Sequence, residues 1–261
     1  MSETPPETPS PRRDDAANWA QSNTLLRVTE AREGAVNLNV NGRQVVGPLQ
    51  GFGQLWLKTF RVTLAGVAAT PAEVVTVWKS HLPSFQPPQN RFFPSLAGVA
   101  PGEIVLINAT LSGMPVDTGV LVLYADDTSF TLMTPQGHPE SGWVTFNADD
   151  EAGAVICRVQ TLSRANDPIY EMGFRMLGTK AQDAIWQHVL TSLARYYGAE
   201  TPVETKHECV DANVQWRYVT NVWENAAIRS QVYRLTTPLR WMRRAPRPAN
   251  TPITPDDEVR E

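Results

Sequence analysis

The sequence has few of the features that would assign it to a familiar functional class. Its 261 residues include only two cysteines, Cys157 and Cys209, and two cysteines in a chain of this length form no disulfide framework. No run of about 18 apolar residues occurs, so no transmembrane helix is predicted. Glycine-rich phosphate loops, the dinucleotide fingerprint and the G-x-S-x-G nucleophile turn are also missing. These absences disfavour the common kinases, dehydrogenases and hydrolases.

The chain also lacks a surplus of basic residues. It has 23 lysines and arginines against 27 aspartates and glutamates, for a formal net charge of -4. Proteins that bind nucleic acids normally carry a basic surface, so we expect no nucleic-acid partner. Residues 2–18 are polar and rich in proline, which predicts no secretory signal. The expected location is the cytoplasm.

The clearest pattern lies in residues 121–169, where three apolar runs are separated by turn-like breaks. Asp126-Asp127 and the cluster at 149–153 have the composition of turns between strands. In the last run, Val155, Cys157 and Val159 alternate with more polar residues. Such a period of two is typical of a strand with one buried face. The segment therefore predicts an antiparallel meander.

Three helices have recognisable starts. Thr70-Pro71-Ala72-Glu73 combines an N-cap, a proline at the first helical position and a capping box. Asp167-Pro168 repeats the cap and proline before a short helix over 169–177. A second capping box at 179–182 begins the longest helix, 180–197, which Gly198 can end.

The remaining segments complete the expected domain organisation. Strands are predicted over 54–64, 102–110, 118–125 and 202–210. A hairpin is predicted over 36–46 because Asn41-Gly42 suits a type I′ turn. The chain is thereby divided into a disordered tail (1–17), a helix and hairpin segment (18–49, with the helix over 18–32), the main domain (50–200), a helical extension (201–244) interrupted near 236–238, and a second disordered tail (245–261).

This element order predicts an α+β fold in which a curved antiparallel sheet wraps around a long helix, with a helical C-terminal extension. The order resembles the helix-grip, START-like fold of polyketide cyclases, plant pollen allergens and lipid-transfer proteins. The resemblance implies a pocket between the sheet and the helix 180–197. Its implied partner is a small hydrophobic or amphipathic molecule, bound without catalysis.

A loop within the meander carries a second resemblance. The sequence Gly137-His138-Pro139-Glu140-Ser141-Gly142 and the downstream Ser163-Arg164 are similar to a bacterial domain family of unknown function. That family has a G-H-P-E-x-G-E core followed by S-R on the next strand. Here Trp143 stands where the family has a second acid. The similarity covers residues 118–167, and the family has no settled activity to carry over.

The same loop supplies the candidate catalytic residues. His138 can titrate near neutral pH, and Glu140, two residues away, can orient it for acid–base chemistry. Arg164 could hold an anion at the mouth of the pocket. In the alternative interpretation the loop is purely structural, and Arg164 pairs with Asp167 or Glu171. An enzyme of the hydrolase, cyclase or isomerase type therefore stays open as an alternative function.

Aromatic residues are the candidates for ligand contact. Trp143, Phe146, Tyr170 and Trp186 are predicted to line the pocket, although each could equally be part of the core. The histidines show no spacing that would suggest a metal site, so no metal and no cofactor are expected. Cys157 is expected to be a small buried hydrophobic residue.

The last helical segment, residues 213–244, combines arginines with tryptophans and aliphatic residues. It can dock on the domain, bind another protein as a scaffold, or lie on an anionic membrane, since basic amphipathic helices bind acidic lipid. Peripheral membrane association through this segment is thus a further alternative.

Overall fold

The chain folds around one antiparallel sheet. A computed structural model describes residues 15–21, 25–111, 113–177 and 180–243. The sheet has eight strands in the order β2-β3-β4-β5-β6-β7-β1-β8, and every neighbouring pair is antiparallel. The strands are β1 (Leu55–Leu64), β2 (Asn90–Pro94), β3 (Ile104–Leu111), β4 (Met114–Ala125), β5 (Ser129–Met133), β6 (Glu140–Glu151), β7 (Ala154–Ala165) and β8 (Glu204–Asp211).

Helices and single turns occupy the rest of the described chain. The α-helices are α1 (Pro71–Ser80), α2 (Pro168–Leu177), α3 (Lys180–Tyr196) and α4 (Ala226–Arg243), and the 3-10 segments are η1 (Ala16–Asn18), η2 (Pro48–Gln50) and η3 (Trp216–Glu224). None of these helices is long and apolar enough to cross a membrane.

Strand β7 lies inside the sheet, between β6 and β1. It pairs along its whole length with β6, from Glu140↔Ala165 to Glu151↔Ala154, and on its other side with β1. Val155, Cys157 and Val159 are buried in the main core, as the alternating pattern predicts. The antiparallel meander β4-β5-β6-β7 is therefore confirmed.

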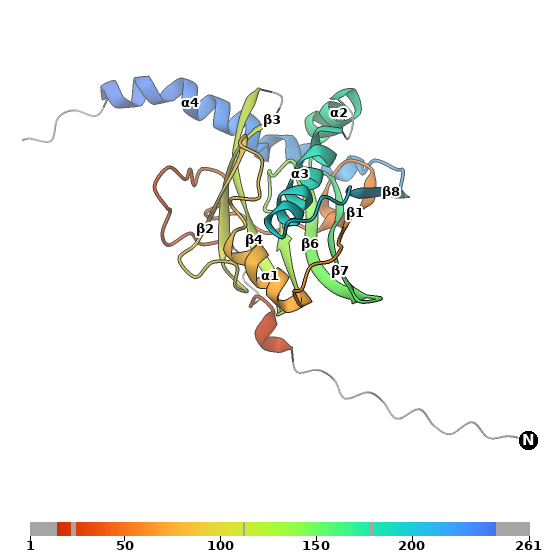
Figure 1. The fold of residues 1–261 in the computed structure, drawn as a ribbon. Helices are drawn as coiled ribbons and strands as arrows, with labels where there is room; N and C mark the ends of the chain where they lie inside the picture. The colour runs from red at the N-terminus through yellow and green to blue at the C-terminus, as the bar shows by residue number, and fades with distance from the viewer. Residues whose placement is uncertain (1–14, 22–24, 112, 178–179, 244–261) are drawn as a thin grey trace, which may run out of the picture.

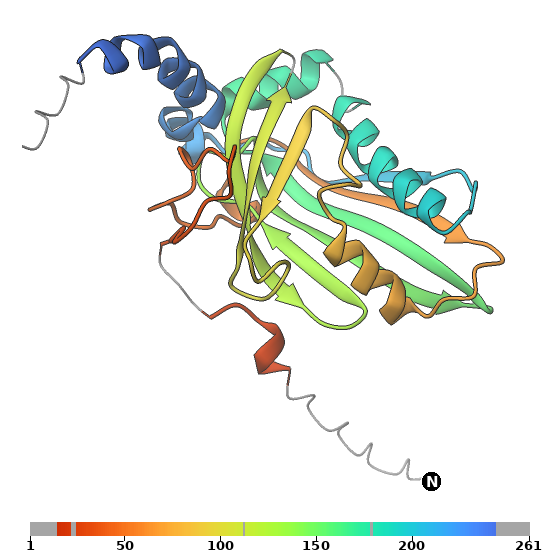
Figure 2. The same ribbon diagram turned by 60° about the vertical axis from the view of Figure 1, so that its left-hand side comes forward.

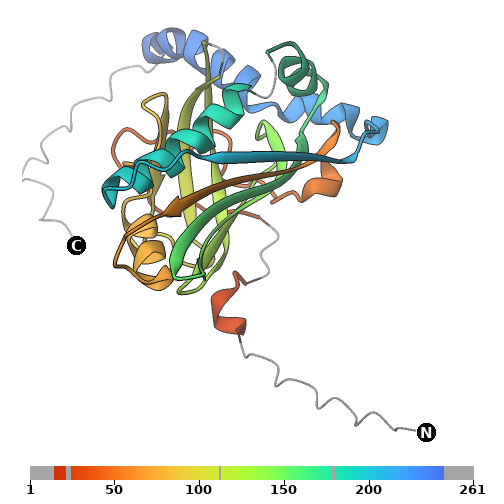
Figure 3. The same cartoon turned by 45° about the vertical axis from the view of Figure 1, so that its right-hand side comes forward.

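Helix α3 lies across the concave face of the curled sheet (Figures 2 and 3). Val189, Leu190 and Leu193 are fully buried on its inner face. Helix α1 packs on the same side, where the Trp78 ring lies 5.3 Å from Phe146, centroid to centroid. This arrangement confirms the predicted α+β, helix-grip fold.

Two predicted helix starts have the expected capping geometry. The Thr70 N–H donates to Glu73 Oε2 at 2.7 Å, and Glu73 N–H donates to Thr70 Oγ1 at 3.3 Å. Asp167 Oδ1 accepts hydrogen bonds from the backbone N–H groups of Ile169 and Tyr170 at 2.9 and 3.1 Å. The capping box predicted at 179–182 begins outside the described residues.

The N-terminal predictions are wrong. The turn at Asn41-Gly42 exists, but only Gly42 has a positive φ of 79°, so the turn is not type I′, and no strands flank it. The polar groups of this segment bond to other parts of the chain: Leu26 N–H donates to Arg43 O at 2.7 Å and Val46 N–H to Thr134 O at 2.8 Å. No α-helix forms in the described part of 18–32. Long-range pairing has replaced the local hairpin.

The C-terminal half of the chain contains one helix that differs from prediction and one strand that extends the sheet. Helix α4 continues through Pro238, so the break predicted near 236–238 is wrong, although a proline inside a helix removes one backbone donor and crowds the preceding turn. The predicted strand 202–210 is confirmed as β8, which pairs with β1. The sheet thus passes the boundary predicted at residue 200, although the division into folding units stays a prediction. The predicted tails lie almost wholly outside the described residues.

Helix α4 begins beside the sheet (Figure 1), and a buried polar cluster docks it on the domain. Asn39 Nδ2 donates to Asp117 O at 2.7 Å and to Ser230 Oγ at 3.2 Å, and Asp117 N–H donates to Ser230 Oγ at 3.0 Å. Arg234 adds hydrogen bonds to the buried Asp117 carboxylate. These contacts fix the start of α4 beside β4.

We expect Trp78→Ala to lower the free energy of unfolding by about 3–5 kcal/mol, because it removes a fully buried ring from the centre of the core. The matched control is Trp223→Ala, since Trp223 is 80% exposed and should change stability by no more than about 0.5 kcal/mol. Urea unfolding followed by circular dichroism measures both values. Equal destabilisation by the two substitutions would contradict this account of the core.

Candidate functional site

A cavity of ≈ 440 Å³ lies between the sheet and the helices α2, α3 and α4. Its wall is mostly apolar, because β3 and β4 present alternate side chains to it. The wall includes Ile107, Ala109 and Leu111 of β3, Val116, Thr118 and Val120 of β4, Leu132 of β5, Val144 of β6, Phe174 of α2, Ile185 and Trp186 of α3, and Ile228 and Val232 of α4. The volume falls within the range of small-molecule pockets.

Several polar atoms around the cavity lack hydrogen-bond partners among the described residues. They are Thr118 Oγ1, Thr161 Oγ1, Gln182 Nε2 and Trp186 Nε1, all with almost no exposed surface. A buried polar atom without a partner is costly, and nearly all such atoms in folded proteins are paired. Each is therefore an unused donor or acceptor at the cavity wall, which a bound molecule reaches only if the side chains covering it shift.

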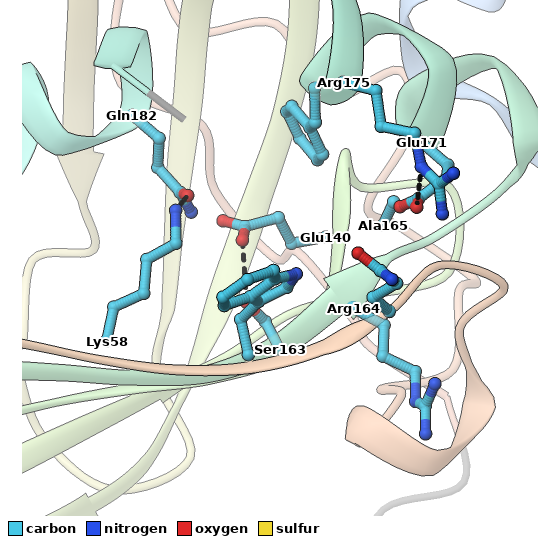
Figure 4. A pocket seen from close by; sticks show the side chains of 11 residues that line it. Lys58, Glu140, Ser163, Arg164, Ala165, Glu171, Arg175 and Gln182 are labelled. Atoms are coloured by element: carbon cyan, nitrogen blue, oxygen red, sulfur yellow. Dashed lines mark hydrogen bonds and ion pairs between the residues drawn. The ribbon is translucent and has the colours of Figure 1, made fainter. Parts of the chain in front are cut away.

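A smaller chamber of ≈ 270 Å³ adjoins the cavity (Figure 4). The two hollows share Glu140, Ser163, Phe174 and Gln182 as wall residues. The chamber is more charged than the cavity, because Lys58, Arg164, Glu171 and Arg175 line it in addition to the shared Glu140. Buried Lys58 reaches across it from β1 to hydrogen-bond the Gln182 side chain of α3, and its Nζ lies 3.4 Å from Asp183.

His138 and Glu140 both border the cavity, and they contact each other. Glu140 N–H donates to His138 Nδ1 at 3.1 Å. The Glu140 carboxylate accepts a hydrogen bond from Ser163 Oγ at 2.7 Å. Burial lowers the pKa of His138, although the negative charge of Glu140 opposes that shift. Their catalytic role stays a prediction.

Arg164 is not brought together with these two residues. Arg164 borders the smaller chamber. Ser163 points toward the hollows, however, so the side chain of Arg164, its neighbour on β7, points to the opposite face (Figure 4). There its guanidinium donates to Gly53 O at 2.7 Å and to Asn213 O at 3.0 Å, and it pairs with Asp211. The hydrogen bond from Arg164 lowers the pKa of Asp211 to about 2. Arg164 thus ties β7 to the chain after β8 and pairs with Asp211 rather than with Asp167 or Glu171. Its anion-holding role stays a prediction.

The four aromatic candidates fall into two groups. Trp186 and Tyr170 border the cavity; the Tyr170 hydroxyl accepts a hydrogen bond from Ala227 N–H at 3.0 Å, and burial raises its pKa. Phe146 is not a wall residue, because it stacks on Phe130 in the core with ring centroids 4.5 Å apart. Trp143 borders the cavity, but its ring lies beside Gly47 on the other face of β6.

Three polar wall residues were missed at the sequence level: Lys58, Thr161 and Gln182. A signal existed for Lys58, because it shares the parity of Phe60 and Val62 on β1, which face the core. A lysine at a core-facing position is unusual and often functional. Nothing in the sequence shows that Gln182, in the first turn of α3, would meet it.

The described part of the chain shows neither a metal-binding cluster nor an ionised Cys157. Within the described ranges, no group of three or more His, Cys, Asp or Glu side chains is placed to hold a metal ion. Burial raises the pKa of Cys157 to about 12, so this thiol is not ionised at neutral pH.

The lowered pKa of His138 predicts a pH dependence of stability. Because the unfolded chain takes up a proton near pH 6.5 and the folded protein does so only at lower pH, stability should be complete above about pH 6.5 and fall as the pH is lowered. His138→Gln cannot take up the proton, so it should reduce this loss. Urea unfolding at several pH values measures the slope.

The control for this experiment is His188→Gln, which replaces an exposed histidine of α3. It should keep the wild-type slope below pH 6.5. An unchanged slope in His138→Gln would show that His138 is not the group responsible.

Comparisons with known proteins place the domain in a family. A comparison with curated proteins finds no match. Solved structures with a related fold include the di-domain ARO/CYC StfQ of the steffimycin biosynthetic pathway, with a TM-score of 0.43 and 11% identity over 55% of this chain and 50% of that one. This chain thus spans half the length of StfQ.

Two plant proteins are also similar in structure. Norcoclaurine synthase from Thalictrum flavum has a TM-score of 0.40 and 14% identity over 56% of this chain and 96% of its own. Major latex-like protein 151 from Panax ginseng has a TM-score of 0.36 and 11% identity over 56% and 99%. At the level of sequence, the model of a domain of unknown function, DUF1990, matches residues 61–199. Because that match covers more than half of the 261 residues, the chain belongs to the DUF1990 family.

Proposed function

We propose that this domain binds a small amphipathic molecule in the cavity between the sheet and helices α2, α3 and α4, without changing it chemically. The observation that supports the proposal most directly is the cavity itself, with a volume of ≈ 440 Å³ and a mostly apolar wall. An apolar body placed there leaves water, which stabilises the complex by about 25 cal/mol per Å² of apolar surface buried.

The polar atoms of the wall add orientation to this apolar attraction. Thr118 and Thr161 present hydroxyl groups, and Trp186 presents an indole N–H, that have no partner among the described residues. A ligand with one or more oxygen atoms can pair with them, whereas a pure hydrocarbon leaves them unpaired. The cavity therefore suits an apolar molecule that carries a few oxygen-containing groups.

The geometry supports acid–base catalysis by His138 and Glu140 less well than it supports binding. An acid–base pair needs a third group that holds the substrate, and the sequence-based candidate for it, Arg164, is directed to the other face of the sheet. The backbone N–H of Glu140 occupies His138 Nδ1. Binding is thus the function we carry forward.

Gly173 allows a direct test of the cavity as the binding site. It lies in α2 on the cavity wall, and a Cβ built on it meets no heavy atom within 4 Å. Gly173→Trp should fill part of the cavity and weaken binding of N-phenyl-1-naphthylamine, an uncharged apolar dye, by about tenfold or more. Fluorescence titration of the full chain gives the dissociation constant.

Gly173→Ala is the matched control. It adds a single methyl group in open space and should stabilise α2 by up to about 1 kcal/mol, because alanine favours helix over glycine, while dye affinity stays near that of the wild type. Wild-type protein that takes up no dye, or equal affinity of the Trp and Ala variants, would contradict the proposal.

A second function, peripheral membrane contact through residues 213–244, is favoured by one specific observation. Ile228, Val232 and Leu235 form a stripe on α4 and are exposed by 43%, 54% and 74%, and the first two also border the cavity. An apolar helical stripe at the cavity mouth could insert into a lipid surface and receive a ligand from it.

For this function we expect Leu235→Glu to reduce sedimentation of the full chain with phosphatidylcholine–phosphatidylserine vesicles, because it places a charge on the apolar stripe. The control is Arg229→Lys, which keeps the charge of the helix. Equal sedimentation of wild type and Leu235→Glu would remove α4 as the membrane-contacting element.

A further inference from the structure

The chamber next to the cavity has a distinctive set of hydrogen-bonding groups. Lys58, Glu140, Ser163 and Gln182 face it from three strands and one helix (Figure 4). Lys58 and Thr161 are directly opposite each other on β1 and β7, and the Gln182 side chain bonds to Lys58 above them. The chamber is therefore assembled where the start of α3 crosses β7 and β1.

On one side the chamber presents donors. Gln182 Oε1 is occupied by Lys58, which leaves the Gln182 Nε2 amide group without a partner among the described residues although it is buried. Lys58 has three N–H donors, and the structure shows two acceptors for them, Gln182 and Asp183. A group that enters here can accept hydrogen bonds.

On the other side the chamber presents an acceptor. Glu140 receives a hydrogen bond from Ser163 on Oε1, and its Oε2 has no partner in the part of the chain described. The other charges near the chamber are balanced in pairs: Lys58 with Asp183, Arg175 with Glu171, and Arg164 with Asp211. The Glu140 carboxylate is thus the charge without a cationic partner among those lining the chamber.

The donors on one side of the chamber and the Glu140 acceptor on the other determine which end group of a ligand fits there. A carboxylate can accept from Gln182 and from the third N–H of Lys58, but it meets the like charge of Glu140. An ammonium group can donate to Glu140 but leaves Gln182 Nε2 unpaired and lies close to Lys58. A hydroxyl both donates and accepts, so it satisfies the two sides without a charge conflict.

We propose that the chamber holds a neutral hydroxyl end of the ligand, alcohol or phenol, while the apolar body occupies the main cavity. The inference rests on the proposed binding function and defines the ligand class. It is supported by the continuity of the two hollows, which share Glu140, Ser163, Phe174 and Gln182. One molecule can therefore reach both.

The test compares three ligands that have the same chain and different ends: 1-dodecanol, dodecanoate and dodecylamine. Each is titrated at neutral pH against the full chain loaded with N-phenyl-1-naphthylamine, and dye displacement gives its affinity. We expect 1-dodecanol to bind more tightly than either charged ligand by about tenfold, since each charged end lacks one favourable interaction and adds a repulsive one.

Two substitutions test whether the preference for 1-dodecanol over the charged ligands arises in the chamber. Gln182→Leu removes the unpaired amide and should weaken 1-dodecanol by roughly fivefold more than it weakens the dye, which carries no hydroxyl. Glu140→Gln removes the negative charge and should narrow the difference between 1-dodecanol and dodecanoate. The matched control is Gln187→Leu, at an exposed position of α3. It should change neither the affinity for 1-dodecanol nor the difference between 1-dodecanol and dodecanoate.

The possible results distinguish a failure of the hydroxyl assignment from a failure of the proposed binding function. Dye uptake together with equal or tighter binding of dodecanoate or dodecylamine overturns the hydroxyl assignment and leaves the binding function intact. An unchanged 1-dodecanol affinity in Gln182→Leu overturns it as well. Absence of dye uptake by the wild type overturns the binding function and, with it, this inference.

Discussion

The pairing of β7 with β6 on one side and β1 on the other is the constraint on which the rest of the structure depends. Its register sets every second side chain of three long strands on the concave face. Val155, Cys157 and Val159 continue the core there, and α3 covers them. Farther along the same strand, Thr161 and Ser163 take the same parity. Core and candidate site are thus two ends of one strand face.

The change from core to hollow follows from the side chains that α3 and the strands bring together. At the far end of α3, Val189, Leu190 and Leu193 fill the space against the sheet. At its first turn, polar Gln182 meets Lys58 of β1 instead. Buried polar side chains need hydrogen-bond partners, and Gln182 and Lys58 supply part of this pairing to each other. The same helix thus seals one end of the sheet and borders a polar chamber at the other.

Sequence reasoning recovered part of the candidate site and misplaced the rest for identifiable reasons. His138 and Glu140 were found because their loop has a recognisable motif, and both border the cavity. Arg164 was grouped with them because it is near in sequence, yet adjacent residues of a strand point to opposite faces. Phe146 and Trp186 are both buried aromatics, and only the positions of neighbouring elements decide that one is core and the other cavity wall.

What the sequence by itself determined is local: the capping at Thr70 and Asp167, the alternation along β7, the long helix and, from their order, the helix-grip fold. These follow from backbone hydrogen bonding and side-chain periodicity within a few residues. The tertiary structure decided which parts of the chain meet. It replaced the expected hairpin at 36–46 by pairing with distant segments, and it brought Lys58 to Gln182 across more than a hundred residues. Such contacts depend on how whole elements pack, because the free energy of burying their shared surface outweighs the local preference of any one segment.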